Sequence, residues 1–396
     1  MSSNRQINGS TLFELGKLFF KLGTIAFGGP AAHIAMMEEE VVHRRKWLTR
    51  EHFLDLVGAI NLIPGPNSTQ LGILIGYTRA GVLGLIVSGL SFILPAVIIT
   101  GMFAWMYVRF GSVPQLSHFL FGIKPAVISV ILLAVIRLGR TAAKNLQLTI
   151  IGIAVATVSL LGANAILALL AGGIAGIIIS SIKGRENKKI SLWVIPFVGT
   201  LEGLMKSSDV NAAMAAPGAG IASISLWKLG LFFLKIGSIL YGSGYVLAAF
   251  LQDGLVRDYG WLTQQQLLDA IAIGQFTPGP VLSTATFVGY VVSGLPGAVI
   301  STIAIFLPSF VFILIVHPFI PRLRASKSMS AFLDAVNISA VGLMAAVVVQ
   351  LASSTLTDWR TVIIAAGVAF AGVRFKLNAA WLVVGGALIG WILKAI

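Results

Sequence analysis

Long apolar runs without a charged side chain dominate the sequence. Such runs separate Arg79 from Arg109, Lys144 from Lys183, Asp269 from Arg322, and Asp334 from Asp358. A helix needs roughly 20 apolar residues to cross the hydrocarbon core of a bilayer. The run that ends at Lys183 is long enough for two such helices, with a turn near positions 161–164. The pattern therefore predicts an all-α polytopic membrane protein.

Basic residues lie in short clusters between the apolar runs, and cytoplasmic loops of membrane proteins are enriched in Lys and Arg. The clusters expected in the cytoplasm are Arg44–Lys46, Arg79, Arg137–Lys144, Lys183–Lys189, Arg322–Lys327 and Arg374–Lys376. One arrangement that satisfies them has five membrane spans in each half of the chain and both termini outside. The spans are expected near 11–27, 82–108, 116–136, 146–161 and 165–181, and near 226–243, 297–317, 330–352, 360–373 and 378–394.

The two halves of the chain are copies of each other. A shift of 214 positions carries Trp47-Leu48-Thr49 onto Trp261-Leu262-Thr263 and Pro64-Gly65-Pro66 onto Pro278-Gly279-Pro280. A shift of 213 then carries Leu94-Pro95 onto Leu307-Pro308. So many matches in register indicate an internal duplication. We expect a first repeat at 1–181, a cytoplasmic linker at 182–224 and a second repeat at 225–396.

An odd number of spans in each repeat places the second repeat upside down relative to the first. The basic loop that contains Arg44 and Arg45 has a neutral counterpart at Arg257 and Asp258, which agrees with this inversion. Inverted-topology repeats are typical of secondary transporters, which bind their substrate near the membrane midplane between the repeats.

A proline–glycine–proline (PGP) segment interrupts one apolar stretch in each repeat, at Pro64, Gly65 and Pro66 and at Pro278, Gly279 and Pro280. Each side of the break has only about ten residues, too few to span a bilayer. Proline suits the end of one helix and the first position of the next. We therefore expect a re-entrant helical hairpin in each repeat, with its PGP tip near the midplane. The alternative is a proline kink in an ordinary span.

The helix after each break should begin at a polar segment. The first opens with Asn67, Ser68, Thr69 and Gln70, and the second with Val281, Leu282, Ser283 and Thr284. Helix N-termini carry free N–H groups and the positive end of the helix dipole, so two such ends rimmed by hydroxyl and amide groups predict an anion site. The segment from Thr263 to Gln266 also fits a capping box that opens the second hairpin.

Charged residues inside apolar helices are costly and usually functional. Lys21 and Lys235 occupy matching positions, and two cations beside two helix ends would suit a small dianion; the alternative is that both lysines reach the membrane surface. Asp55 and Asp269 also match and are candidates for carrying a coupling proton, as is His33, although interfacial or structural roles explain them equally well. The run from Glu38 to Glu40 is expected to be a solvated face.

Composition excludes several classes of protein. The chain is 57% hydrophobic and only 11% charged, and its mean hydropathy is +0.93, which excludes a soluble domain and a disordered chain. The net charge is +14, but such an apolar chain is not expected to bind nucleic acid. The absence of Cys excludes disulfides and thiolate metal sites, so no metal or cofactor is expected. No hydrolase motif or Walker loop occurs, which predicts transport driven by an ion gradient or by the substrate's own gradient.

The segment Phe27-Gly28-Gly29-Pro30-Ala31-Ala32-His33, with Glu40-Val41-Val42 and Trp47-Leu48 after it, resembles the first motif of the chromate transporter (CHR) family. Gly242-Ser243-Gly244-Tyr245-Val246 and the paired PGP segments resemble the family's long, two-domain form. The resemblance implies a multi-pass inner-membrane protein that exports chromate by a chemiosmotic mechanism and confers chromate resistance. It places functional motifs on Gly28, Gly29, Pro30 and His33, with Gly242 as the counterpart of Gly28.

Chromate and sulfate are tetrahedral dianions of similar size, so uptake of sulfate or a related oxyanion is an alternative on the same scaffold. A passive anion channel and a membrane-embedded chromate reductase are further alternatives, and the lack of Cys and of cofactor motifs argues against the reductase. The expected partners are the oxyanion, membrane lipid and, as a candidate, a second copy of the chain.

Overall fold

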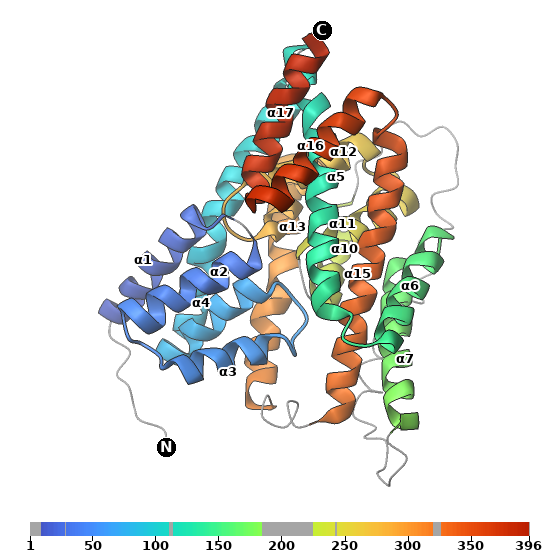
Figure 1. Cartoon of the computed structure of the whole chain (residues 1–396). Coiled ribbons are helices and arrows are strands. Elements are labelled where there is room, and N and C mark those ends of the chain that lie inside the picture. The colour runs from blue at the N-terminus through green and yellow to red at the C-terminus, as the bar shows by residue number, and fades with distance from the viewer. Residues whose placement is uncertain are drawn as a thin grey trace.

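The computed structural model describes residues 9–27, 29–110, 114–183, 225–241, 244–319 and 326–395, which form helices joined by short loops (Figure 1). The first repeat contains α1 (Gly9–Ile25), α2 (Pro30–Glu38), η1 (Glu39–Arg44), α3 (Arg50–Ile60), α4 (Asn67–Phe110), α5 (Pro114–Ala142), α6 (Leu146–Leu160) and α7 (Ala165–Lys183). The second contains α10 (Leu226–Ile239), η3 (Gly244–Val246), α11 (Leu247–Leu251), η4 (Gln252–Asp258), α12 (Gln264–Phe276), η5 (Val281–Ser283), α13 (Thr284–Val316), η6 (His317–Phe319), α15 (Lys327–Thr355), α16 (Trp359–Phe375) and α17 (Ala379–Ala395). Gly28, Gly242 and nearly all of the predicted linker lie outside the described residues.

The duplication extends to irregular features of the backbone. The π-helical segments η1 and η4 occupy matching positions. The long helices α4 and α13 are each interrupted at a matching pair of residues, Ala80–Gly81 and Ser293–Gly294, and the two glycines have φ of +60° and +63°. Positive φ favours glycine, which explains why both repeats carry one there. Two copies that share such details have the same fold, so the predicted all-α, two-repeat architecture is confirmed.

Five of the described helices are long and apolar enough to cross a membrane, within α4, α5, α7, α13 and α15, and two shorter apolar helices lie in α6 and α17. The predicted spans at 11–27 and 226–243 correspond to α1 and α10, but α1 has 17 residues and α10 only 14. At 1.5 Å per residue, α10 is about 21 Å long, less than the roughly 30 Å of the hydrocarbon core. The prediction of five full spans in each repeat is therefore not met by helix length.

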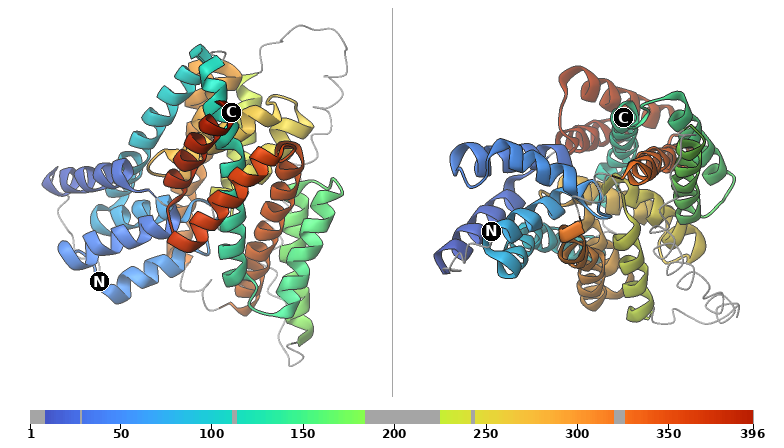
Figure 2. Two further views of the ribbon diagram at one scale, coloured as in Figure 1. Left: turned by 45° about the horizontal axis from the view of Figure 1, so that its top comes forward. Right: turned by 90° about the horizontal axis from the view of Figure 1, so that it is seen from below.

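The repeats are interlocked rather than side by side. Helices α16 and α17 of the second repeat pack on α5 of the first, and α6 and α7 of the first repeat pack on α15 of the second (Figures 1 and 2). Small residues allow close approach: Gly122 on α5 meets the backbone of α17 at Gly386 and Gly390. In Figure 1, α5 and α15 run in opposite directions along the long axis of the molecule.

Helices α4 and α13 cross at the centre, with α1 packed on α4 and α10 packed on α13 (Figure 2). Gly23 on α1 faces the backbone of Phe92, and its counterpart Gly237 on α10 faces the backbone of Ile305. These contacts position the chain after α1 and after α10 at the crossing point. The predicted capping box is also confirmed, because the Thr263 hydroxyl accepts a hydrogen bond from the Gln266 N–H and the Gln266 side chain accepts one from the Thr263 N–H.

Candidate functional site

The two PGP segments interrupt their helices as expected and meet the opposite repeat. Helix α3 ends at Ile60 and α4 begins at Asn67, and α12 ends at Phe276 before η5 begins at Val281. The glycine of each segment donates its N–H across the repeat boundary. Gly65 donates to the Leu240 carbonyl at 2.6 Å, and Gly279 donates to the Ala26 carbonyl at 2.9 Å.

These two hydrogen bonds are equivalent, since a shift of 214 carries Gly65 onto Gly279 and Ala26 onto Leu240. A reciprocal pair of contacts is the signature of a two-fold relation between two copies. Both glycines have positive φ, +132° and +90°. The backbone N–H can therefore point out of each tip toward the other repeat.

Buried polar side chains surround the first break. Ser68, Thr69 and Gln70 in the first turn of α4 are all buried, and the Gln70 amide donates to the Pro64 carbonyl. Ser309 on α13 approaches from the second repeat, where its hydroxyl would lie 2.8 Å from a Cβ added at Gly65. The hydroxyls of Thr69 and Ser309 and the Gln70 Oε1 are buried without a hydrogen-bond partner among the described residues. The two hydroxyls can donate hydrogen bonds to a ligand, whereas the Gln70 Oε1 can only accept one.

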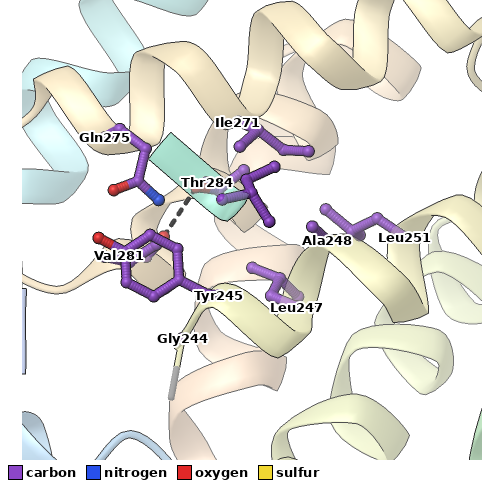
Figure 3. A pocket seen from close by; sticks show the side chains of 10 residues that line it. Gly244, Tyr245, Leu247, Ala248, Leu251, Ile271, Gln275, Val281 and Thr284 are labelled. Atoms are coloured by element: carbon purple, nitrogen blue, oxygen red, sulfur yellow. Dashed lines mark hydrogen bonds between the residues drawn. The ribbon is translucent and has the colours of Figure 1, made fainter. Parts of the chain in front are cut away.

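The second break has the corresponding helix start but a different set of partners. The Thr100 hydroxyl on α4 donates to Ser283 at 3.1 Å, and the Thr284 hydroxyl donates to the Val281 carbonyl at 2.7 Å. Beside Thr284 lies a cavity of about 10 Å³, enough for roughly one water molecule. Figure 3 shows the Gln275 amide and the Tyr245 ring at one end of this cavity, close to Val281.

The glycine–proline motif of the first repeat lies beside Tyr245, one of the residues that line this cavity. Gly29 has φ of +78°, and a Cβ added there would lie 3.8 Å from the Tyr245 hydroxyl. Pro30 is the first residue of α2. His33 on α2 is buried, and its Nε2 lies 3.0 Å from the Ala26 carbonyl that also accepts the Gly279 N–H. The structure thus brings Gly29, Pro30 and His33 together with the second break.

The two predicted lysines both interact with acidic residues, one in direct contact and one at longer range. Lys21 is exposed on α1 and donates to Glu40 Oε1 at 2.9 Å. Lys235 is exposed on α10 and interacts electrostatically with Asp258. The expectation of a solvated face at Glu38–Glu40 is wrong for Glu40, which is 7% exposed because π-helix η1 turns it toward α1.

Glu40 is the centre of an ion cluster with Lys21, Arg44 and Arg45. Burial alone raises the pKa of its carboxyl, but the hydrogen bonds and charges of Lys21 and Arg45 outweigh burial and hold the pKa below its usual value. This cluster joins η1 to α1, at a place where the sequence predicted only exposed charge.

The two predicted aspartates have different surroundings. Asp55 on α3 is exposed, whereas its counterpart Asp269 on α12 is buried and accepts a hydrogen bond from Tyr107 of α4 at 2.9 Å. Sequence reasoning missed Tyr107, Gln275 and Ser309. Ser309 had a detectable signal, because it directly follows the matched Leu307-Pro308 and is polar where the first repeat has Ala96.

Comparison with known proteins decides the family. The sequence model of the chromate transporter family matches residues 13–177 and 227–391, one match in each repeat. The chain belongs to the chromate transporter family. This transporter is 32% identical to the chromate transport protein of Cupriavidus metallidurans, over 96% of the chain and 93% of that protein. It is 31% identical to the probable chromate transport protein of Synechococcus elongatus, over 89% and 88%. It is 28% identical to the chromate transport protein of Pseudomonas aeruginosa, over 96% and 92%.

No solved structure matches the chain. The family and the five long apolar helices establish a multi-pass membrane protein. Family membership also confirms the resemblance based on Gly29, Pro30, His33 and the PGP segments.

Proposed function

We propose that this transporter exports chromate, a tetrahedral oxyanion, across the cytoplasmic membrane by secondary active transport and thereby confers chromate resistance. The names of its relatives support chromate as the substrate. The structural observation that carries the proposal is the reciprocal pair of hydrogen bonds from Gly65 and Gly279. That pair holds both helix-opening breaks at the boundary between the repeats.

The proposed substrate site lies at the starts of α4 and α13. The first turn of α4 supplies N–H groups without intrahelical acceptors, and the positive end of the helix dipole favours a dianion there. Thr69 and Ser309 would add hydroxyl donors that have no other partner among the described residues. A hydrogen bond to a charged group contributes about 1.5–3 kcal/mol, so a few such donors offset part of the cost of removing an oxyanion from water.

Alternating access between inverted repeats would carry the substrate across. The opposite directions of α5 and α15 and the charge difference between the matching loops support the inversion. The cavity beside Thr284 holds about one water, too little for a tetrahedral oxyanion. Binding therefore requires the helix starts to move apart, and the breaks at Gly81 and Gly294 are suited to serve as hinges.

The PGP segments are proposed to be tips of re-entrant hairpins, because α3 and α12 have only 11 and 13 residues and cannot span a bilayer. The additional role of Lys21 and Lys235 in attracting the anion stays a prediction, since Lys21 pairs with Glu40 and Lys235 interacts electrostatically with Asp258. His33, Asp55 and Asp269 are the candidates for coupling transport to a proton gradient.

Flux in proteoliposomes tests the proposal. Purified protein in sealed vesicles should move radiolabelled chromate faster than protein-free vesicles do, and an imposed ion gradient should drive accumulation. Transport of sulfate but not chromate would favour the oxyanion-uptake alternative. Chromate flux that runs only down the chromate gradient, and does not respond to an imposed ion gradient, would indicate a passive channel. Reduction of hexavalent chromium by protein and a reductant, above that of a control without protein, would indicate a reductase.

A further inference from the structure

A buried carboxylate joins the two repeats on the helix that leads into the second break. Asp269 on α12 is 1% exposed, and its Oδ2 accepts the hydrogen bond from Tyr107 on α4. Its Oδ1 is buried and has no hydrogen-bond partner among the described residues. An ionised carboxylate with an unsatisfied oxygen in an apolar setting is costly, and binding a proton removes that cost.

Two charged side chains come first among the titratable groups on the elements packed against α12. Lys124 on α5 interacts with it electrostatically. Arg109, two residues beyond Tyr107, is exposed. The packed elements α11, α13 and η5 carry no Asp, Glu, Lys, Arg or His, and α12 carries no other. The remaining titratable groups on packed elements are His118, Arg137 and Arg140 on α5, Tyr77 and Arg79 on α4, Tyr290 on α13, Asp253, Arg257 and Asp258 on η4, and Lys394 on α17.

The repeat provides an internal comparison. Asp55 occupies the matching position on α3 and is exposed. The two carboxylates have the same place in the fold, so the difference between them comes from how the repeats pack. The interface is closed over Asp269, and closing it over an ionised carboxylate is unfavourable. Protonation of Asp269 and closure of the repeats at this end are therefore linked.

We propose that Asp269 is the proton-binding site that couples transport to a proton gradient, with Tyr107 as its positioning residue. The inference rests on the proposed function, because it identifies the coupling ion of the same transporter. The proton comes from bulk water, binds Oδ1 and neutralises the carboxylate while Oδ2 keeps the Tyr107 hydrogen bond. It returns to bulk water once the interface opens. Helix α12 connects this event to the tip at Gly279, three residues after the helix ends at Phe276.

The Asp269→Asn variant tests the proposal because it resembles a permanently protonated Asp269. Two assays are compared in proteoliposomes: counterflow, which exchanges radiolabelled for unlabelled chromate without a gradient, and accumulation driven by pH gradients imposed in either direction. We expect Asp269→Asn to lose gradient-driven accumulation at least tenfold while counterflow stays measurable. The matched control is Glu51→Gln, an exposed carboxylate on α3 whose counterpart in the second repeat is already Gln265; it should keep both activities.

Three results would overturn the inference. The first is gradient-driven accumulation that persists in Asp269→Asn. The second is a loss of accumulation in Asp55→Asn but not in Asp269→Asn. The third is a loss of counterflow together with accumulation in Asp269→Asn. By contrast, a wild-type protein that fails to exchange chromate would refute the proposed function itself.

The Tyr107→Phe variant gives an independent readout. It removes the hydrogen bond that stabilises the carboxylate and keeps the ring, which packs 5.2 Å from Phe287. The midpoint of the pH dependence of accumulation should move upward by about one pH unit. A merely structural role would lower the rate without moving this midpoint, and an unmoved midpoint would exclude Tyr107 as the positioning residue.

Discussion

His33 and Ala26 are joined by a buried hydrogen bond, in which the imidazole Nε2 donates to the Ala26 carbonyl at 3.0 Å. The same carbonyl accepts the Gly279 N–H from the other repeat. At the equivalent contact, Leu240 accepts the Gly65 N–H, but Leu247 stands where His33 would be. The histidine therefore supports only one of the two hydrogen bonds between the repeats, so the centre of the molecule departs from two-fold symmetry.

Replacing His33 with Leu, the residue of the second repeat, should weaken this support. The Ala26 carbonyl keeps its bond from Gly279, so we expect a loss of about 1 kcal/mol in stability and a melting temperature lower by a few degrees. The transport rate should fall, while the pH midpoint of transport should not move, because the coupling proton is proposed to bind Asp269 and not His33. Thermal unfolding in detergent and a pH profile check this; a shifted midpoint would make His33 a coupling group.

Alanine at Gly279 should damage the centre of the molecule. Its φ of +90° is unfavourable for alanine, and the new Cβ would lie 2.9 Å from the Gly23 carbonyl oxygen. Strain of this kind costs about 1–3 kcal/mol, and it would displace the tip that donates to Ala26. We expect chromate flux to fall at least tenfold. The control is Gly367→Ala, a helical glycine with open space around it, which should be neutral or stabilising. Equal chromate flux in the two variants would argue against a role of the Gly279 tip in transport.

Removing a single hydroxyl at the first break should weaken chromate binding. Ser309→Ala deletes a buried donor that has no other partner in the described part of the chain. The loss of one hydrogen bond to a charged ligand predicts a KM about tenfold higher or more. The same substitution at Ser181, whose hydroxyl bonds to the Ile177 carbonyl on the exposed side of α7, should leave KM unchanged. An unchanged KM in Ser309→Ala would show that the substrate does not bind beside Ser309.

The ion cluster at Glu40 should make stability depend on acid pH. Because the pKa of Glu40 is lowered in the folded protein, its stabilising contribution is present above the unfolded pKa of about 4.5. That contribution is lost as the pH falls through the lower folded value. Glu40→Gln should therefore destabilise the protein at neutral pH and reduce the loss of stability at acid pH. Denaturation in detergent at several pH values would show both effects. If the stability of Glu40→Gln falls at acid pH as much as that of the wild type, Glu40 is not ion-paired.

Lys21→Ala distinguishes the two roles of this lysine. If Lys21 serves the Glu40 cluster alone, the variant loses stability, by about 1 kcal/mol or less because the lysine side chain is half exposed, and keeps its KM for chromate. If it also attracts the oxyanion, KM rises. Measuring both quantities on the same preparation separates a pairing role from a binding role.

The repeat, both PGP breaks and the helix starts after them could be predicted from the sequence, because each depends on local chemistry. The Pro-Gly-Pro sequence interrupts each helix through its own backbone, whereas single prolines such as Pro95 and Pro308 lie inside helices. The Thr263 cap needs only the next turn of chain. The environment of Glu40 was not predictable, since the sequence shows three consecutive glutamates and only the π-helical turn distinguishes one of them. The difference in burial between the two aspartates was not predictable for a related reason. Asp55 and Asp269 match in sequence, but their burial depends on Tyr107 and on how the repeats close.

The sequence by itself determined that this is a membrane protein made of two similar halves, each broken at a PGP segment. Apolar composition, residue spacing and the conformational limits of proline and glycine act within a few residues and can be read along the chain. Only the tertiary structure decided which carbonyl each tip glycine binds and which helices exchange between the repeats. Those partners lie in the opposite repeat, and their choice follows from the close packing of α4 across α13, which no local pattern encodes.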